Sequence, residues 1–211
     1  MNRVEKKFII ENGFDSKKVL FYLSKNFVIN KKFENREINS IYLDTANYDY
    51  MSDNLDGIKN RIKSRLRFYS GTNNQFVYEE KIKKNEIGFK KKLYFDIADT
   101  EKLDWDICLA KFKESHLFIT TKFNLRESLF VKYNRAYMVD LFGNSITHDT
   151  NIKFYDVKYF NNPIIYKKSV IEYKIEEENF KKRLFYNFKL RNNRHSKYVV
   201  GMALLNKTLY V

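Results

Sequence analysis

The stretch Arg61-Ile62-Lys63-Ser64-Arg65-Leu66-Arg67-Phe68 decides the fold, because every odd position in it is cationic and most even positions are apolar. Alternation with a period of two places successive side chains on opposite faces of a β-strand. The stretch therefore predicts a strand with one wholly basic face and one largely apolar face. The next stretch repeats the pattern, with Glu79, Lys81 and Lys83 on one face and Ile82 on the other.

A third stretch, at about 87–96, again places cations on one face, at Lys90 and Lys92. Turn-forming residues separate the three stretches, which predicts that the strands are antiparallel neighbours. Between Lys59 and Lys92 the chain has eleven Lys and Arg residues and three acidic residues. This sheet therefore carries much of the net charge of +14.

Mixed alternation of acids and bases also occurs at both ends of the chain, in Arg3-x-Glu5-x-Lys7 and in Glu172-x-Lys174. A single charged strand face is ordinary in a half-solvated sheet. Repeated Glu-x-Lys pairs on strands far apart in sequence instead indicate one shared site. If the strands close into a barrel, the charged faces line a tunnel that suits a phosphate chain, with cations on the phosphoryl oxygens and carboxylates on a divalent metal.

The pattern over the whole chain predicts an antiparallel, mostly β, α+β protein with flanking helices and no domain boundary, that is, a single domain over 1–211. Strands are expected at about 3–10, 38–44, 60–69, 75–83, 87–96, 126–140, 145–156 and 169–176. Helices are expected at about 15–27, 101–113, from Glu176 to Phe188, and 198–209.

Composition excludes several classes of protein. With 211 residues, 44% hydrophobic and 17% aromatic, and with one Pro and six Gly, the chain is expected to be globular and not disordered. It has no apolar run of about 20 residues and a charged N-terminal stretch, which predicts no membrane insertion, no signal peptide and a cytoplasmic location. The lone Cys108 and three histidines predict that any metal is held by oxygen ligands.

The net charge of +14 favours a polyanionic partner. Nucleic acid is the generic alternative, but the chain has no recognition-helix or ribonucleoprotein motif, so no specific nucleic acid is expected.

Motifs in a fixed order run nearly the whole length of the chain. They are Arg3-x-Glu5-x-Lys7-Phe8, Ile41-Tyr42-Leu43-Asp44-Thr45, Leu55-Asp56-Gly57, Arg61-x-Lys63-x-Arg65-x-Arg67-x-Tyr69, Glu79-x-Lys81-x-Lys83, Lys90-x-Lys92, Val131-x-Tyr133-x-Arg135-Ala136-Tyr137, Thr147-x-Asp149, Val170-Ile171-Glu172-x-Lys174 and Ser196-Lys197-Tyr198. With these motifs the chain resembles the vacuolar transporter chaperone (VTC) domain, the polyphosphate polymerase branch of the triphosphate tunnel metalloenzyme (CYTH-like) superfamily.

The resemblance implies a closed antiparallel eight-stranded β-barrel that transfers the terminal phosphoryl group of ATP to a growing polyphosphate chain, assisted by Mn²⁺ or Mg²⁺. Arg65, Arg67 and Lys197 would then serve catalysis. The residues expected to bind the substrate are Lys7, Lys63, Lys81, Lys83, Lys90, Arg135 and Arg194. Glu172 matches the metal-binding glutamate of the family. Glu5 and Glu79 are either further metal ligands or partners that hold Lys7 and Lys81.

Ser145 departs from the family pattern, because it stands where the family has an arginine. Losing one charge-assisted contact costs roughly 1.5–3 kcal/mol unless another residue replaces it. Lys63 and His148 are candidates to replace the missing positive charge. His148, however, is out of phase with Ser145 along the strand and is expected to point to the other face. Asp44 is expected to serve as a turn or cap residue.

Two alternatives to the polymerase remain open. A metal-dependent inorganic or nucleoside triphosphatase would use water as the acceptor, although such hydrolases typically begin with Glu-x-Glu-x-Lys and this chain has Arg3 at the first position. A non-catalytic polyphosphate-binding module is the second, and it is motivated by Ser145. The sequence leaves the oligomeric state open.

Overall fold

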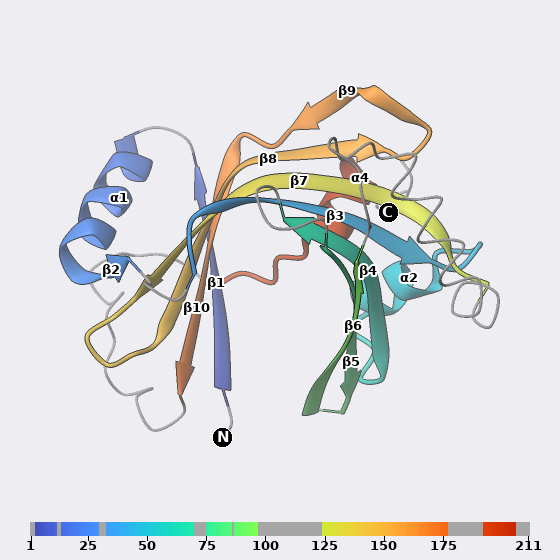
Figure 1. Cartoon of the computed structure of the whole chain (residues 1–211), viewed down its shortest axis with the longest axis horizontal. Coiled ribbons are helices and arrows are strands. Elements are labelled where there is room, and N and C mark those ends of the chain that lie inside the picture. Colours follow the sequence, from blue (N-terminus) through green and yellow to red (C-terminus); the bar gives the residue numbers. More distant parts are fainter. Residues whose placement is uncertain are drawn as a thin grey trace. The chain divides into compact units, whose positions relative to one another are not determined.

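A computed structural model of the chain describes residues 3–11, 14–29, 33–69, 75–85, 87–96, 124–176 and 192–205. Figure 1 shows the elements in chain order. The strands are β1 (Arg3–Glu11), β2 (Val28–Ile29), β3 (Arg36–Asp44), β4 (Arg61–Tyr69), β5 (Gln75–Lys84), β6 (Ile87–Asp96), β7 (Arg126–Val139), β8 (Ser145–Asp156), β9 (Tyr159–Ile165) and β10 (Lys168–Glu176). The helices are α1 (Phe14–Asn26), α2 (Asp49–Leu55) and α4 (Lys197–Leu204).

All eight predicted strands are present, with ends within about two residues of the expected positions. Helix α1 is confirmed. The first part of the predicted final helix is confirmed as α4, and its predicted end, 206–209, lies outside the described residues. The short elements β2, β9 and α2 were not predicted. The predicted helices at 101–113 and from Glu176 to Phe188 lie outside the described residues, apart from Glu176 itself, which ends β10.

The strands form one ten-stranded antiparallel sheet with the order β1-β10-β8-β7-β3-β4-β5-β6, to which β2 adds on β7 and β9 on β8. This order corrects the prediction of a closed eight-stranded barrel, because the path is open, with β1 and β6 as its terminal strands. The alternation of side chains predicts strands and faces but not closure. Closure also requires a tilt and a stagger that bring the two end strands into hydrogen-bonding register.

The described chain divides into two compact units. The first unit comprises Met1–Glu37, Lys132–Lys153 and Ile165–Ser196, and the second comprises Ile38–Val131, Phe154–Ile164 and Lys197–Val211. Each unit is assembled from segments that are distant in sequence, and β7 and β8 contribute residues to both. That residues 1–211 form a single domain stays a prediction.

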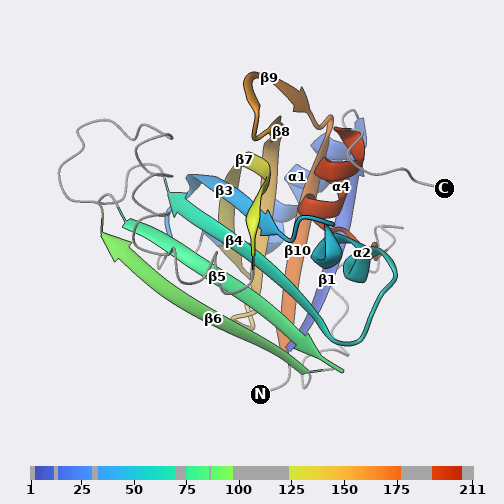
Figure 2. The ribbon, with the colours of Figure 1, turned by 90° about the vertical axis from the view of Figure 1, so that its right-hand side faces the viewer.

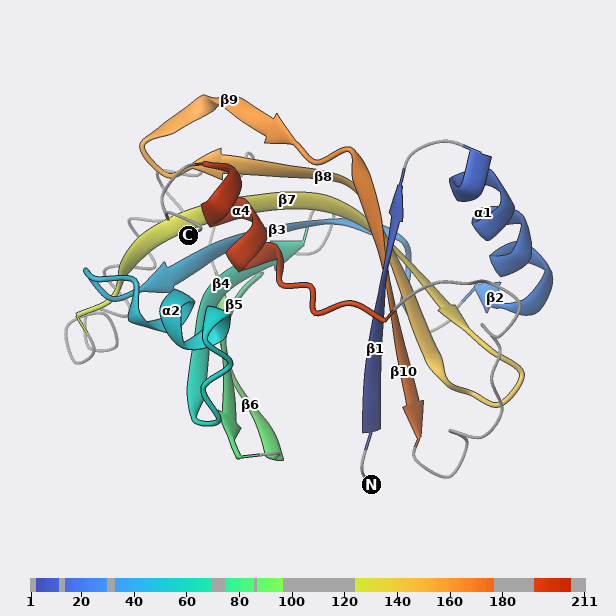
Figure 3. The same cartoon turned by 180° about the vertical axis from the view of Figure 1, so that it is seen from behind.

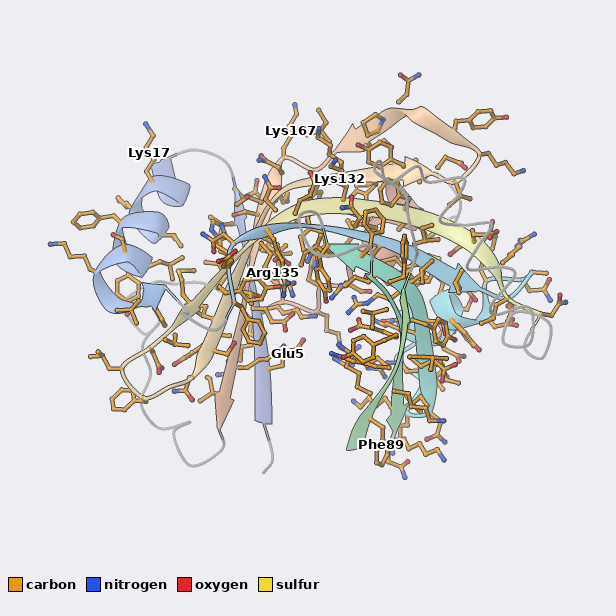
Figure 4. The ribbon with its side chains drawn as sticks, in the orientation of Figure 1. Glu5, Lys17, Phe89, Lys132, Arg135 and Lys167 are labelled. Atoms are coloured by element: carbon orange, nitrogen blue, oxygen red, sulfur yellow. The ribbon has the colours of Figure 1, made fainter. Side chains whose placement is uncertain are left out.

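In the first unit, α1 covers the apolar face of the strands. Val19, Leu23 and Phe27 recur at helical spacing and are all buried, in a cluster with residues of β1, β8 and β10. The strand β1 pairs with β10 over nine residues, from Arg3 opposite Glu176 to Glu11 opposite Lys168. Figure 4 shows Lys17 on the other side of α1, pointing away from the sheet. The opposite face of β1 and β10 carries charged residues, among them Glu5, Lys7 and Glu172.

In the second unit, β3, β4, β5 and β6 form a continuous antiparallel ladder (Figure 2). The even positions of β4 and β5, such as Leu66 and Phe76, pack into a second apolar cluster with Ile41 and Leu43 of β3. The helix α4 packs closely on β7 and β8 at Gly201, which faces Leu129 and Phe154. The odd positions of β4 and β5 therefore form the opposite face of the ladder.

Candidate functional site

Cations gather on one face of the β4–β5–β6 ladder. The register places Arg65 opposite Glu79 and Glu79 opposite Lys92, so these three positions share a face. We call this surface the basic face, and its charged members besides Glu79 are Arg61, Lys63, Arg65, Arg67, Lys81, Lys83, Lys90 and Lys92. The alternation in the sequence predicted this shared face correctly.

Glu79 lies at the centre of the basic face and is only 2% exposed. Its Oε2 accepts a hydrogen bond from Nε of Arg65 at 2.7 Å and lies 3.7 Å from Nη1 of Arg67. Its Oε1 lies 2.5 Å from Nζ of Lys90. Burial alone would raise the pKa of the Glu79 carboxyl, but the charges of Arg65, Arg67 and Lys90 outweigh it and hold that pKa well below its usual range. Glu79 is therefore a fixed negative charge that anchors three cations from the two strands on either side of β5, Arg65 and Arg67 of β4 and Lys90 of β6.

The strand β3 supplies two further contacts that the sequence did not single out as site residues. Ser40 is paired with Arg67 in the ladder, and its Oγ accepts a hydrogen bond from Nε of Arg67 at 3.1 Å. Tyr42 is paired with Arg65, and its hydroxyl oxygen lies 3.4 Å from Nη1 of Arg65. Both arginines are thus contacted from β3 on one side and by Glu79 of β5 on the other, which limits the orientations of their guanidinium groups.

The ring of Tyr42 stacks on that of Tyr198 in α4, with centroids 4.9 Å apart and planes 13° from parallel. Burial raises the pKa of the Tyr42 phenol, but the positive charges of Arg65, Arg67 and Lys197 together lower it below its ordinary value. Lys197, the first residue of α4, is thereby close enough to act electrostatically at the edge of the basic face.

Asp44 is a cap residue, as the sequence predicted. Its carboxylate accepts hydrogen bonds from the backbone N–H groups of Tyr50 and Met51, in the first turn of α2, at 2.9 and 3.0 Å, and from that of the neighbouring Thr45 at 2.7 Å. The hydroxyl of Tyr198 donates a further hydrogen bond to Oδ2 of Asp44 at 2.5 Å. Asp44 therefore holds α2, α4 and the end of β3 together, and Tyr198 is fixed beneath Tyr42.

Lys90 is a cation of the basic face whose ammonium is disfavoured by its surroundings. Its pKa is lowered to about 8, because burial and the neighbouring Arg65 and Arg67 disfavour the ammonium more than Glu79 favours it. Lys63 and Lys81 are directly opposite each other in the β4–β5 register, and Lys81 is opposite Lys90 in the β5–β6 register. Lys83 lies further along β5, opposite Arg61.

A second charged site, in the first unit, lies on β1 and β10. Nζ of Lys7 lies 3.0 Å from Oε1 of Glu5 and 3.8 Å from Oε2 of Glu172, and Nζ of Lys174 lies 2.9 Å from Oε1 of Glu172. Although burial opposes it, the charges of Lys174, Lys7 and Arg135 hold the pKa of Glu172 well below its usual range. We call Glu5, Lys7, Glu172 and Lys174 the carboxylate cluster, and Figure 4 shows Glu5 and Arg135 among the side chains gathered beside these strands.

Arg135 is fixed next to this cluster by Asp149. Nε of Arg135 donates to Oδ1 of Asp149 at 2.6 Å, and Nη2 donates to Oδ2 at 2.7 Å, which is a two-pronged ion pair on a carboxylate that is 1% exposed. The sequence placed Arg135 in the site but gave Asp149 no role. The available signal was the alternation of Ser145, Thr147 and Asp149 along one face of β8.

The segment before α4 meets β1 at Lys7, and Figure 3 shows it reaching this strand. The backbone N–H of Asn193 donates to the carbonyl of Lys7 at 2.9 Å, the side chain of Asn192 accepts from the N–H of Lys7 at 3.1 Å, and Nζ of Lys7 donates to the carbonyl of His195 at 3.2 Å. Arg194, which was predicted to bind substrate, is exposed on this segment.

Ser145 lies opposite Lys174 in the β8–β10 register, on the face of the carboxylate cluster, so the missing family arginine would stand there. His148 points to the other face, as predicted, where its Nε2 is 3.0 Å from Oγ of Ser169. Burial lowers the pKa of His148, although Asp149 acts in the opposite direction. His148 therefore does not replace the charge that Ser145 lacks.

The predicted metal ligands differ in how well they fit a divalent cation. In the part of the chain that the structure describes, no three His, Cys, Asp or Glu side chains form a metal-binding group. Glu5 and Glu172 share one face and one cation, Lys7, and supply the hard oxygen donors that Mg²⁺ or Mn²⁺ prefers. They fit a metal whose remaining ligands are water and substrate oxygens. The two oxygens of Glu79 are engaged by cations, which favours the anchoring role instead.

The predicted site residues thus fall into two groups. The second unit brings together Arg65, Arg67, Lys90 and Glu79, with Lys63, Lys81 and Lys83 on the same face and Lys197 near Tyr42. The first unit brings together Lys7, Glu5 and Glu172, with Arg135 close enough to act on Glu172.

Several solved structures resemble this chain in fold. No curated protein matches the chain. Among solved structures, a candidate adenylyl cyclase from Hippeastrum with a dominant triphosphatase activity is similar, with a TM-score of 0.56, 15% identity and 96% of each chain covered. A candidate adenylate cyclase from Vibrio parahaemolyticus has a TM-score of 0.53 and 15% identity over 94% of this chain and 97% of that chain. The PH1819 protein from Pyrococcus horikoshii OT3 has a TM-score of 0.53 and 12% identity over 97% of this chain and all of that chain.

These structures share the fold at low identity. Among the described residues, no helix is both long and apolar enough to cross a membrane. The model of one family, the VTC domain, matches residues 2–206. Because that match spans nearly all 211 residues, the chain belongs to the VTC-domain family.

Proposed function

We propose that this protein is a metal-dependent, cytoplasmic polyphosphate polymerase that uses ATP. In the reaction, a terminal oxygen of the polyphosphate chain attacks the γ-phosphorus of ATP. The bond from the γ-phosphorus to the bridging oxygen of ADP breaks, a new phosphoanhydride bond forms, and ADP leaves. Such a transfer requires positioning and charge neutralisation more than covalent help from the protein.

The observation that carries the proposal is the anchoring of Arg65, Arg67 and Lys90 on the buried Glu79. Three cations held on one carboxylate keep a net positive charge in fixed positions, which favours binding of phosphoryl oxygens and stabilises the charge that develops on them. Arg65 and Arg67 are assigned to the transferred phosphoryl group together with Lys197. Lys63, Lys81, Lys83 and Lys90 extend the positive charge along the ladder for the rest of the triphosphate or polymer.

In the first unit, Arg135 and Lys7 are assigned to substrate phosphates, with Arg194 on the exposed segment beside them. Glu172 and Glu5 would hold the divalent metal, and Mn²⁺ or Mg²⁺ would neutralise phosphoryl charge there when bound. The low pKa of Glu172 keeps its carboxylate ionised over the whole physiological pH range, which suits this role.

A triphosphatase is the second candidate, and the Hippeastrum structure favours it, because that protein has a dominant triphosphatase activity and a similar fold. The same cations would bind the triphosphate, and water would replace the polyphosphate chain as the acceptor. The two candidates therefore differ in the acceptor and not in the phosphate-binding residues.

The test is to incubate the purified protein with ATP and Mn²⁺, to resolve the products on a urea gel stained for polyphosphate, and to assay ADP and free phosphate in parallel. A polymer ladder with ADP in equal amount to the phosphate incorporated is the expected result. Free phosphate without polymer would replace the polymerase by the triphosphatase. Binding of polyphosphate with neither product would leave a binding module.

Two variants make this test specific. Arg67→Ala removes a cation anchored on Glu79 and is expected to abolish polymer formation. Lys91→Ala removes an exposed cation from the opposite face of β6, where the register places it opposite Glu80, and is expected to leave the activity unchanged. Circular dichroism of both variants verifies that each is folded. An equal loss of activity in the two variants would contradict the assignment of the basic face.

A further inference from the structure

An exposed aromatic ring stands at one end of the basic face. The strand β6 alternates between its faces, and the contact of Lys90 with Glu79 fixes the even positions on the basic face. Tyr94 is therefore on the same face as Lys90 and Lys92, and Nζ of Lys92 lies 5.9 Å from the centre of its ring. The side chain of Tyr94 is 54% exposed, although large aromatic side chains are usually well covered.

The position of this ring relative to the anchored arginines follows from the register. Arg67 of β4 is opposite Val77 of β5, and Val77 is opposite Tyr94 of β6. Neighbouring strands lie about 4.8 Å apart, so Tyr94 and Arg67 stand on one cross-strand row about 10 Å apart. Lys92 and Lys90 fill the next two positions along β6 on the same face. A ligand with phosphates at Arg65 and Arg67 thus has a π-face within reach at the edge strand.

We propose that Tyr94 is a nucleobase-stacking residue, which binds the base of the nucleoside triphosphate whose phosphates are held on the basic face. The inference rests on the proposed function, because it assumes that a nucleotide binds there. Stacking of bases on aromatic side chains tolerates any base, since every base has a π-face, and a nearby cation such as Lys92 adds to the attraction. The ring distinguishes a nucleotide from an inorganic phosphate chain, which has no base to stack.

This role separates two kinds of ligand on one surface. A growing polyphosphate chain would use only the cations, whereas ATP would use the cations and Tyr94. The ring thereby favours the donor nucleotide over inorganic tripolyphosphate of similar charge. It would also be vacated when the base leaves with ADP.

The experiment measures the dissociation constants of a non-hydrolysable ATP analogue and of tripolyphosphate by calorimetry, for the wild type and three variants. Tyr94→Ala is expected to weaken the analogue about tenfold, the usual order for one stacked base, and to leave tripolyphosphate within about twofold. Tyr94→Phe keeps the ring and is expected to bind both ligands like the wild type. Leu93→Ala is the matched control, because Leu93 is 45% exposed on the opposite face of the same strand.

The outcomes separate this inference from the proposed function. If Tyr94→Ala binds the analogue as the wild type does, or loses both ligands equally, the stacking role is wrong, and the phosphate-binding role of the basic face stands. If the wild type binds neither the analogue nor tripolyphosphate, the proposed function itself is wrong, and the inference is overturned with it. A loss in Leu93→Ala as large as in Tyr94→Ala would likewise overturn the assignment, because it would reflect damage to β6.

Discussion

Nε of Arg65 donates a hydrogen bond to Oε2 of Glu79 over 2.7 Å, from a neighbouring strand to a carboxylate that is almost completely buried. The same carboxylate contacts Arg67 and Lys90, so it faces more positive charge than it neutralises. On this surface the buried acid offsets part of the repulsion among the three cations. The surface nevertheless keeps an excess of positive charge for a phosphate ligand.

Replacing Glu79 by Gln is expected to destabilise the protein strongly. The change removes the charge that compensates three cations, and breaking a buried ion pair costs about 3–5 kcal/mol. Urea unfolding measures the loss. Glu11→Gln is the control, because the ion pair of Glu11 with Lys168 is exposed and worth at most about 1 kcal/mol. Similar losses in the two variants would contradict the anchoring role of Glu79.

The pKa of Lys90 predicts a pH dependence of phosphate binding. Because this pKa is about 8 instead of 10.5, Lys90 loses its charge in the folded protein as the pH rises through about 8. The affinity for tripolyphosphate is therefore expected to fall about tenfold across this range, the loss of one charge-assisted contact. Calorimetry between pH 7 and pH 9.5 measures this change.

Lys90→Arg is the control for that titration, since a guanidinium stays charged throughout this pH range. Its affinity is expected to change less with pH than that of the wild type, and parallel curves would contradict the role of Lys90. The sign for stability is opposite to that for binding. Between pH 8 and 10.5 the unfolded chain holds more protons at Lys90 than the folded chain, so this group makes the free energy of unfolding rise with pH.

The faces of the long strands were predictable from the sequence, because a period of two needs no knowledge of the neighbouring strands. The alternation in β4 placed Arg65 and Arg67 on one face correctly. The unpredicted elements lack such a signal. The strand β9 contains Asn161, Asn162 and Pro163, residues that are unfavourable in strands, and α2 has only seven residues, with no side-chain cap from Tyr48.

The partners of the site residues were harder to predict than the residues themselves. Ser40 and Tyr42 contact the arginines because β3 pairs with β4 in one particular register, and that register is not encoded in either strand alone. The ion pair between Arg135 of β7 and Asp149 of β8 was hard to predict for the same reason. Closure into a barrel was predicted wrongly, because it depends on strand tilt and stagger, which alternation does not specify.

Gly201→Ala is expected to destabilise the protein, although alanine favours helices by about 1 kcal/mol over glycine. A Cβ at Gly201 would lie 2.5 Å from Cδ1 of Phe154 and 2.6 Å from Cδ2 of Leu129, and both side chains are completely buried. Overpacking of this kind costs typically 1–3 kcal/mol. Thermal unfolding tests the sign. Gly88→Ala is the control, because a Cβ at Gly88 meets no atom within 4 Å. An increase in the stability of Gly201→Ala would contradict the prediction and show that α4 shifts freely to make room for the methyl group.

Ser145→Arg is expected to strengthen phosphate binding in the first unit. Ser145 is opposite Lys174 in the β8–β10 register, and the next pair on the same face is Thr147 opposite Glu172. A new guanidinium at position 145 would therefore join the face that carries the carboxylate cluster. One additional charge-assisted contact is worth about 1.5–3 kcal/mol, which predicts a rise of roughly tenfold or more in the affinity for tripolyphosphate. The like charge of Lys174 directly opposite would lower the stability by less than about 1 kcal/mol.

Thr150→Arg separates this gain from a general effect of charge. It adds the same charge to β8, but position 150 is out of phase with Ser145 and belongs to the opposite face of the strand. Calorimetry at two salt concentrations compares the variants, because long-range attraction between charges is screened by salt whereas a direct contact is screened less. An equal rise in both variants, or no rise in Ser145→Arg, would mean that substrate phosphates do not reach this face, and the assignment of Lys7 and Arg135 to the substrate would then be wrong.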